Sequence, residues 1–167
     1  MSVSEAPDVE LCLLRHAHAG DPLEWTGPDE ARPLSSRGRK QAERLGRLLA
    51  EIGFAPTVIL SSPKRRALET AQIVASALDQ PVRTDQELGV GPDLADVERL
   101  LREQGNPRRP LLVGHDPEFS EIASGLVGAP ILVSKGTLIR IDAPRPLRQG
   151  TGALRWLVPP DLLKPER

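Results

Sequence analysis

VELCLLRH, residues 9–16, is an apolar run that ends in an arginine and a histidine. A run this short and this apolar suits a strand buried on both faces, as strands are in a parallel sheet. Arg15 and His16 then stand where the strand ends. The following stretch, residues 20–34, is rich in glycine, proline and aspartate, which predicts a loop.

The same order of strand, polar residues and helix recurs along the chain. Helices are indicated where apolar residues recur at helical spacing behind a capping residue. We expect strands at residues 9–14, 57–60, 81–84, 111–113, 137–141 and 153–158. We expect helices at residues 35–52, 63–78, 93–104 and 117–128. Strands that alternate with amphipathic helices predict a three-layer α/β/α sandwich with a mostly parallel central sheet. The strand at 81–84 is expected at an edge of that sheet, since Pro81 would disrupt a central ladder. The strands at 137–141 and 153–158 are expected at the sheet's edge because their apolar and polar residues alternate.

The length of 167 residues fits one domain. We expect it over residues 9–163, between a flexible N-terminal tail, residues 1–8, and a C-terminal tail, residues 164–167. Acidic and basic residues nearly cancel, for a net charge of -1, and aromatic residues are scarce, with no tyrosine. The chain therefore has neither the basic field nor the stacking platforms typical of nucleic-acid binders. We expect no nucleic-acid or membrane partner.

Cys12 is the single cysteine, so no disulfide can form within the chain, and its apolar neighbours favour a small buried side chain. The first residues lack the basic start and the apolar stretch of a signal peptide. Both observations favour a cytoplasmic protein.

Polar residues follow three of the expected buried strands. Arg15 and His16 follow the first, residues 61–66 follow the second and include Arg66, and His115 follows the third. Ligands of parallel α/β sheets bind beyond the carboxyl ends of the strands. We therefore expect Arg15, His16, Arg66 and His115 to form one site.

These residue types are suited to a phosphoryl group. Arginine binds phosphate oxygens with a planar, permanently charged fork. A neutral histidine with one free ring nitrogen can attack phosphorus and form a covalent intermediate, and a second histidine, when protonated, can stabilise charge in the transition state. The set predicts phosphoryl chemistry that needs neither a metal nor a cofactor.

Two other interpretations of these residues stay open at this point. His16 and His18 lie two apart, which on an extended strand gives one face and suits a zinc site, although the chain has only three histidines. The basic run at residues 64–66 could form a nucleic-acid patch, although three cations at a helix start more often form a local anion site or a solvated face.

Several segments resemble the signatures of the histidine phosphatase superfamily. The resemblance covers nearly the whole chain, and two of its features, residues 86–88 and the ending at 156–160, are similar to the compact bacterial SixA-type phosphohistidine phosphatases. The main segments are LRHA (14–17), with Ala17 in place of the usual glycine, RPLSSRGRKQA (32–42), SSPKRRALETA (61–71) and VGH (113–115).

The resemblance implies a phosphoglycerate mutase-like fold and a role for each matching residue. His16 would be the nucleophile, Arg15 and Arg66 would hold the phosphoryl oxygens, and His115 would be the second pocket histidine. Arg32 would also reach the phosphate. The implied substrate is phosphohistidine on a signalling protein, such as a histidine phosphotransfer domain, or a small phosphorylated molecule.

The resemblance departs from the family at the general acid. Many members carry a glutamate two residues after a leucine, where it protonates an alkoxide leaving group; aligning on Leu88 places Val90 there. Glu87, His18 and Asp93 are the candidates for another proton donor. An alkoxide depends strongly on general acid catalysis, typically about 10²–10⁴-fold, whereas a phosphorylated imidazole is a better leaving group. The absence of a general acid at this position therefore favours phosphohistidine over sugar phosphates as the substrate.

Two alternatives to a phosphohistidine phosphatase are kept. One is a small-molecule phosphomonoester phosphatase that uses Glu87 or His18 as its acid. The other is a phosphate-binding module without catalysis.

Overall fold

The computed structural model describes residues 6–164 of the chain. Residues 1–5 and 165–167, which make up most of the two expected tails, lie outside the described residues.

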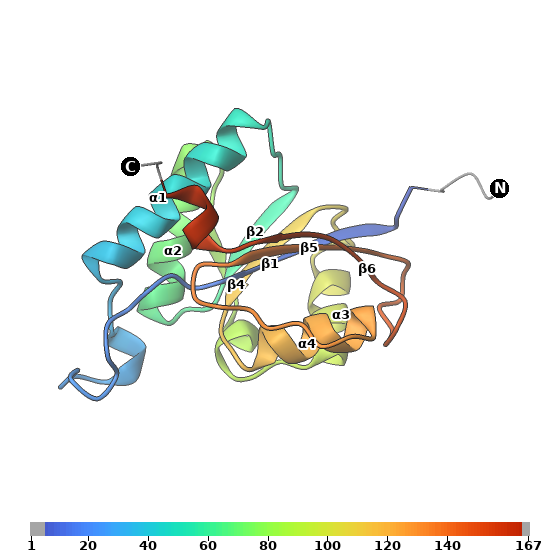
Figure 1. Cartoon of the computed structure of the whole chain (residues 1–167). Coiled ribbons are helices and arrows are strands. Elements are labelled where there is room, and N and C mark those ends of the chain that lie inside the picture. The colour runs from blue at the N-terminus through green and yellow to red at the C-terminus, as the bar shows by residue number, and fades with distance from the viewer. Residues whose placement is uncertain (1–5, 165–167) are drawn as a thin grey trace.

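A six-stranded sheet in the order β3-β2-β4-β1-β5-β6 forms the middle of the molecule (Figure 1). β1 to β4 are parallel to one another, β5 is antiparallel to β1, and β6 is antiparallel to β5. The predicted, mostly parallel sheet is confirmed. The strands are β1 (Val9–Arg15), β2 (Val58–Ser61), β3 (Arg83–Thr84), β4 (Pro110–Gly114), β5 (Leu138–Ala143) and β6 (Ala153–Val158).

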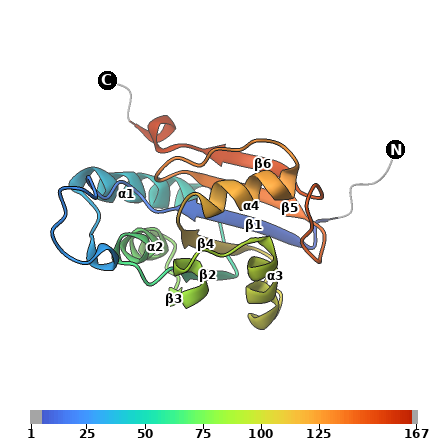
Figure 2. The same ribbon diagram turned by 90° about the horizontal axis from the view of Figure 1, so that it is seen from below.

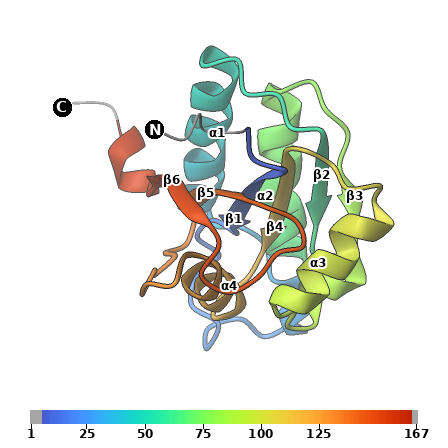
Figure 3. The same ribbon diagram turned by 90° about the vertical axis from the view of Figure 1, so that its right-hand side faces the viewer.

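Helices cover both faces of the sheet, which confirms the three-layer sandwich (Figure 3). α1 and α2 pack on one face, and α3 and α4 pack on the other. None of the helices in residues 6–164 is long and apolar enough to cross a membrane. The helices are α1 (Ser36–Glu51), α2 (Arg65–Ala77), α3 (Leu94–Glu103) and α4 (Glu118–Val127).

The position of β1 in the middle of the sheet explains why its residues are apolar on both faces of the strand. Leu11 and Leu13 belong to the core beneath α3 and α4, whereas Cys12 and Leu14 belong to the core beneath α1 and α2. A strand sandwiched between two helical layers buries both sets of alternating side chains. β1 is thus the central element on which both cores are built.

Local signals set the helix ends. Ser35 caps α1 by accepting a hydrogen bond from the N–H of Gly38 at 3.1 Å, and Gly53 follows that helix with a left-handed φ of 68°. Asp93 caps α3 through a reciprocal pair of hydrogen bonds with Asp96. These ends agree with the helices expected at residues 35–52 and 93–104.

Two expectations about the elements are wrong. α2 begins at Arg65, so Pro63 precedes the helix instead of standing in its first turn; the turn before the helix is held by Ser62, whose Oγ accepts the Lys64 N–H at 3.2 Å. β5 lies inside the sheet rather than at an edge, because it pairs with both β1 and β6.

Candidate active site

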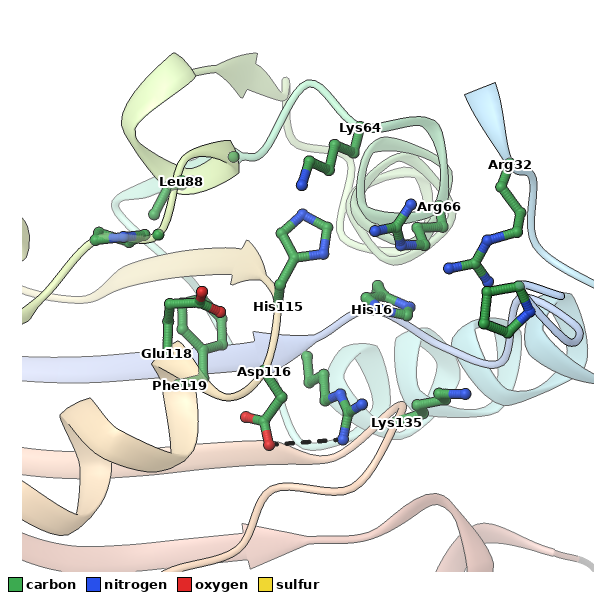
Figure 4. Close-up of a pocket in the computed structure, with 15 residues that line it drawn as sticks. His16, Arg32, Lys64, Arg66, Leu88, His115, Asp116, Glu118, Phe119 and Lys135 are labelled. Atoms are coloured by element: carbon green, nitrogen blue, oxygen red, sulfur yellow. Dashed lines mark ion pairs between the residues drawn. The ribbon is translucent and has the colours of Figure 1, made fainter. Parts of the chain in front are cut away.

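The carboxyl ends of β1 and β4 meet at one edge of the sheet, beside the loop that follows β1 (Figure 2). The register pairs Arg15 of β1 with Gly114 of β4, and Ser61 of β2 with Val113. A cavity of about 320 Å³ opens at this edge. Its walls include all five residues expected at the phosphoryl site: Arg15, His16, Arg32, Arg66 and His115 (Figure 4).

His16 is buried and held in one tautomer. Its Nδ1 lies 2.8 Å from the carbonyl oxygen of Ala17, and because a carbonyl only accepts, Nδ1 must carry the proton. The pKa of His16 is lowered to about 3, mainly by burial; the Ala17 hydrogen bond opposes this effect, and the charges of His115, Arg66 and Arg15 act in the same direction as burial. His16 is therefore neutral near pH 7, with its lone pair on Nε2.

The backbone behind His16 is fixed by two side chains from other segments. Thr70 Oγ1 accepts the N–H of Ala17 at 3.1 Å and donates to the carbonyl of Arg66 at 2.7 Å. Gln41 Oε1 accepts the N–H of His18 at 3.0 Å. Thr70 lies in segment 61–71 and Gln41 lies in segment 32–42, two of the segments that resemble the family's signatures. No role was expected for either residue from the sequence. Ala17 does not have a positive φ, so alanine in place of the family's usual glycine causes no backbone strain at this position.

His115 lies next to His16, with 5.3 Å between the two ring centroids. Its Nε2 is 2.8 Å from the hydroxyl of Ser62. Burial lowers the pKa of His115 to about 3, and the nearby charges of Arg66 and Lys64 add to this effect. His115 is therefore neutral near pH 7 in this structure, in contrast to the protonated second histidine considered from the sequence.

Arg15 is anchored at the cavity wall by a backbone carbonyl and a carboxylate. It donates to the carbonyl of Val133 at 2.8 Å and lies 3.7 Å from a carboxylate oxygen of Asp116. The same carboxylate accepts the backbone N–H and the hydroxyl of Ser120, which ties the arginine to the first turn of α4. These contacts leave Arg15 Nε without a partner.

Arg66 and Arg32 share one acidic residue, Asp29 of the loop after β1. Arg66 donates to the Asp29 carbonyl at 2.9 Å and to its carboxylate at 3.0 Å. Arg32 donates to the other carboxylate oxygen from two nitrogens, both at 3.3 Å, and to the carbonyl of Ala19 at 2.9 Å. Asp29 thus holds two arginines side by side at the edge of the cavity.

Three buried side-chain nitrogens in the described part of the chain have no hydrogen-bond partner, and all three belong to this cluster. They are Arg15 Nε, Arg66 Nε and His115 Nδ1. Buried polar atoms are nearly always paired, and the exceptions need a reason. An oxyanion placed among these nitrogens would accept hydrogen bonds from the Nε–H groups of the two arginines.

Two lysines add positive charge to the cavity. Lys64 belongs to the basic run at residues 64–66, for which a local anion site was one of the interpretations, whereas Lys135 was not expected there. Lys64 lies just before α2, and Lys135 comes immediately before the turn into β5 (Figure 4). Burial lowers the pKa of Lys135, and the charges of Arg15 and Arg32 act in the same direction. The cavity is therefore strongly cationic although the whole chain is nearly neutral.

The proton donors considered from the sequence lie elsewhere. Glu87 pairs with Arg99 at 3.2 Å, His18 bonds Ser35 through Nδ1 at 2.7 Å, and Asp93 caps α3. None of the three lines the cavity. No three His, Cys, Asp or Glu side chains within residues 6–164 are grouped so that they could hold a metal ion.

Glu118 instead brings a carboxylate to the cavity wall from the first turn of α4. Its Oε1 would lie 3.4 Å from a Cβ built on Gly91, so it sits beside the segment in which the family acid was expected. Val90 in that segment is 73% exposed and takes no part in the cavity. Sequence reasoning missed Glu118 because it belongs to a different element.

Comparison with known proteins adds to this geometry. A model of the histidine phosphatase superfamily (branch 1) matches residues 11–89. An uncharacterized protein of Picosynechococcus sp. is 32% identical over 140 residues, which are 78% of this chain and 83% of that protein. An 8-oxo-(d)GTP phosphatase of Mycolicibacterium smegmatis is 32% identical over 106 residues, and the match spans 61% of this chain but only 32% of that protein.

Among solved structures, the protein histidine phosphatase SixA complexed with tungstate superposes with a TM-score of 0.80. The match covers 93% of this chain and 100% of that chain at 21% identity, so it shows a shared fold. The phosphoglycerate mutase-like architecture expected from the sequence is confirmed. The chain belongs to the histidine phosphatase superfamily and is a phosphatase.

Proposed function

We propose that the chain is a phosphohistidine phosphatase that works through a covalent phosphohistidine on His16. The observation that carries this proposal is the hydrogen bond from His16 Nδ1 to the Ala17 carbonyl, which leaves a lone pair on Nε2. Nε2 attacks phosphorus, and the bond from phosphorus to the leaving group breaks with its electrons on the leaving atom. The Ala17 carbonyl stabilises the positive charge that the imidazole gains. Water then attacks phosphorus, phosphate departs, and Nε2 regains its lone pair.

The cluster around His16 supports phosphoryl transfer. Arg15, Arg66 and His115 each contribute one buried nitrogen without a hydrogen-bond partner, and all three line the same cavity as Arg32. Donors already in place for oxygens that gain charge in the transition state lower the barrier without reorganisation. In this proposal Arg15 and Arg66 hold the phosphoryl oxygens, and Arg32 assists from the loop.

A phosphohistidine substrate is supported by the kind of leaving group that the site serves best. Glu87 and His18, the acids considered from the sequence, are turned to Arg99 and Ser35. An imidazole leaving group can take its proton from solvent. A substrate with that leaving group therefore suits a site without a dedicated acid at the expected place.

A protein substrate is supported by the rim of the cavity. Pro22 and Gly89 line the cavity, and their neighbours Leu23 and Val90 are 92% and 73% exposed. Exposed apolar side chains beside a cationic pocket favour contact with a folded partner over contact with a sugar phosphate. We propose a histidine phosphotransfer domain as the partner. We also propose the cytoplasm as the location, because the chain's single cysteine, Cys12, is a free and buried thiol, which suits a reducing compartment.

A second candidate function, hydrolysis of small phosphomonoesters, is favoured by Glu118. Its carboxylate lines the cavity and could protonate an alkoxide, a role first considered for Glu87 or His18. The two candidates differ in the leaving group and share the chemistry at His16.

The test compares turnover of a phosphorylated histidine phosphotransfer domain with turnover of aryl and alkyl phosphomonoesters. We expect the highest kcat/KM on the phosphoprotein, complete loss with His16→Ala, and retention with His18→Ala, a matched control outside the cavity. Turnover of small esters without turnover of the phosphoprotein would favour the second candidate. Phosphate binding without turnover of any substrate would indicate a module without catalysis.

A further inference from the structure

Ser62 is completely buried and lies between the end of β2 and the start of α2. Its hydroxyl oxygen accepts a hydrogen bond from the backbone N–H of Lys64 at 3.2 Å and lies 2.8 Å from Nε2 of His115. A Cβ built on Gly89 would come within 3.2 Å of the same oxygen. The backbone of Gly89 therefore covers the hydroxyl closely.

The hydrogen-bond partners of Ser62 decide which nitrogen of His115 carries the proton. A hydroxyl has one proton to donate. The Lys64 N–H donates to the Ser62 oxygen, so that contact leaves the hydroxyl proton without an acceptor. Within residues 6–164 the only acceptor in reach of that proton is His115 Nε2. A buried hydroxyl without an acceptor costs free energy, so Ser62 donates and Nε2 has a lone pair. In the neutral imidazole the proton must then be on Nδ1.

Nδ1 of His115 is the ring nitrogen that faces the reaction site. It is buried without a partner, and Figure 4 shows the ring turned with this side toward His16 and Arg66. The lowered pKa of His115 agrees with a neutral ring. A proton on Nδ1 therefore places a third N–H beside those of Arg15 and Arg66.

We propose that Ser62 is a positioning residue that holds His115 as the neutral Nδ1–H tautomer, so that His115 donates a hydrogen bond to a phosphoryl oxygen without first taking up a proton. This inference rests on the proposed function, because it assumes that the phosphoryl group lies between His16 and His115. Histidine in water favours the Nε2–H tautomer. The hydroxyl of Ser62 is therefore the group that reverses that preference.

The direct test is the tautomer of His115 in the wild-type protein, read from two-bond ¹H–¹⁵N correlations of uniformly labelled chain. The chain has only three histidines, so His16→Asn and His18→Asn assign the spectrum. We expect His115 Nε2 at the shift of an unprotonated nitrogen and Nδ1 at that of a protonated one. The opposite pattern would overturn the proposal, whether or not any variant folds.

Ser62→Ala adds a kinetic readout. We expect kcat to fall about tenfold with KM changed by less than threefold, because one donor to the transition state is lost while the arginines still bind substrate. The His115 tautomer should shift toward Nε2–H. Ser61→Ala is the matched control, since Ser61 is equally buried but donates to the carbonyl of Ser62, and it should leave the tautomer unchanged.

The outcomes separate this proposal from the proposed function. If His16→Ala retained turnover, the phosphohistidine mechanism would fail whatever Ser62 did. If wild-type His115 carried its proton on Nε2, or if Ser62→Ala left both kcat and tautomer unchanged, only the role of Ser62 would be rejected. Ser62→Thr, which keeps the hydroxyl, should restore the Nδ1–H tautomer; a folded threonine variant without it would also count against the proposal.

Discussion

Arg66 donates to Asp29 at two points, the backbone carbonyl at 2.9 Å and the carboxylate at 3.0 Å. The carboxylate is also in contact with Arg32, so one half-exposed side chain neutralises part of the charge on two arginines of the cavity. The arginines lower the pKa of Asp29 against the effect of its partial burial. An incoming phosphoryl group has to compete with this carboxylate for the same two arginines.

Asp29→Asn should tighten the binding of inorganic phosphate and vanadate. The amide keeps an oxygen that can accept from Arg66 but removes the negative charge that competes with the ligand. Since a partly exposed ion pair contributes up to about 1 kcal/mol, we expect up to about fivefold tighter binding. Isothermal titration measures it, with Glu30→Gln on the same loop as a charge-matched control. Weaker binding by Asp29→Asn than by Glu30→Gln would show that Asp29 mainly orients the arginines.

Gly38→Ala should destabilise the fold and the site together. A Cβ on Gly38 would lie 2.0 Å from the carbonyl oxygen of His18, and a backbone atom cannot move aside cheaply. We expect a loss of about 2 kcal/mol or more in the free energy of unfolding. Gly125→Ala in α4 is the control, because its Cβ would meet nothing closer than 3.9 Å; it should be neutral or stabilising by about 0.5–1 kcal/mol. Chemical denaturation measures both, and equal effects of the two changes would contradict the tight approach at Gly38.

Stability should fall as the pH drops below about 6.5, the ordinary pKa of histidine. In the folded chain the pKa of His16 and of His115 is about 3, so below pH 6.5 the unfolded chain takes up protons that the folded chain does not. The stability is complete above that pH and is lost progressively toward pH 3. Between pH 7.5 and pH 5 we expect a loss on the order of 2 kcal/mol per histidine.

Urea unfolding at the two pH values measures this loss, and His115→Asn should remove about half of it. The carboxylates with lowered pKa, such as Glu10 and Asp29, affect stability only nearer pH 4, so they do not obscure the interval. The pKa of His18 is also lowered, and His18→Asn corrects for its share. A pH-independent stability over this interval would mean that both cavity histidines titrate normally.

Glu118→Gln should separate leaving groups. If the Glu118 carboxyl group protonates alkoxides, turnover of alkyl phosphates should fall about 100-fold while aryl phosphates and phosphohistidine change little, because their leaving groups need less help. Steady-state kinetics on the three substrate classes measures this, with the exposed Glu121→Gln of the same helix as control. A uniform loss on all three classes would instead indicate a role in binding.

The residues that could be predicted from the sequence are those governed by one simple rule. Arg15, His16 and His115 end or follow parallel strands, and the carboxyl ends of neighbouring parallel strands meet at one edge. Arg66 comes from the helix that follows such a strand. The apolar runs and caps that place these elements are local, which explains why their order and approximate ends were correct.

The residues that were missed depend on contacts that no local pattern records. Lys135 precedes β5, and it reaches the cavity only because β5 runs antiparallel to β1, so that its amino end lies at the same edge. Glu118 reaches the cavity because the turn after His115 directs the first residue of α4 inward. Asp29 lies in a loop without periodicity. Likewise, Glu87 was a candidate acid by its place in the chain, and its pairing with Arg99 could not be known without the fold.

The central claim is that Nε2 of His16 carries the phosphoryl group during turnover. The most direct measurement is rapid quenching of the enzyme with ³²P-labelled phosphohistidine protein into alkaline detergent, followed by peptide mapping. We predict one label, stable in alkali and labile in acid, on the peptide that contains His16, present in His18→Ala and absent in His16→Ala. A label on another residue, or turnover in the absence of any phosphoenzyme, would contradict the account.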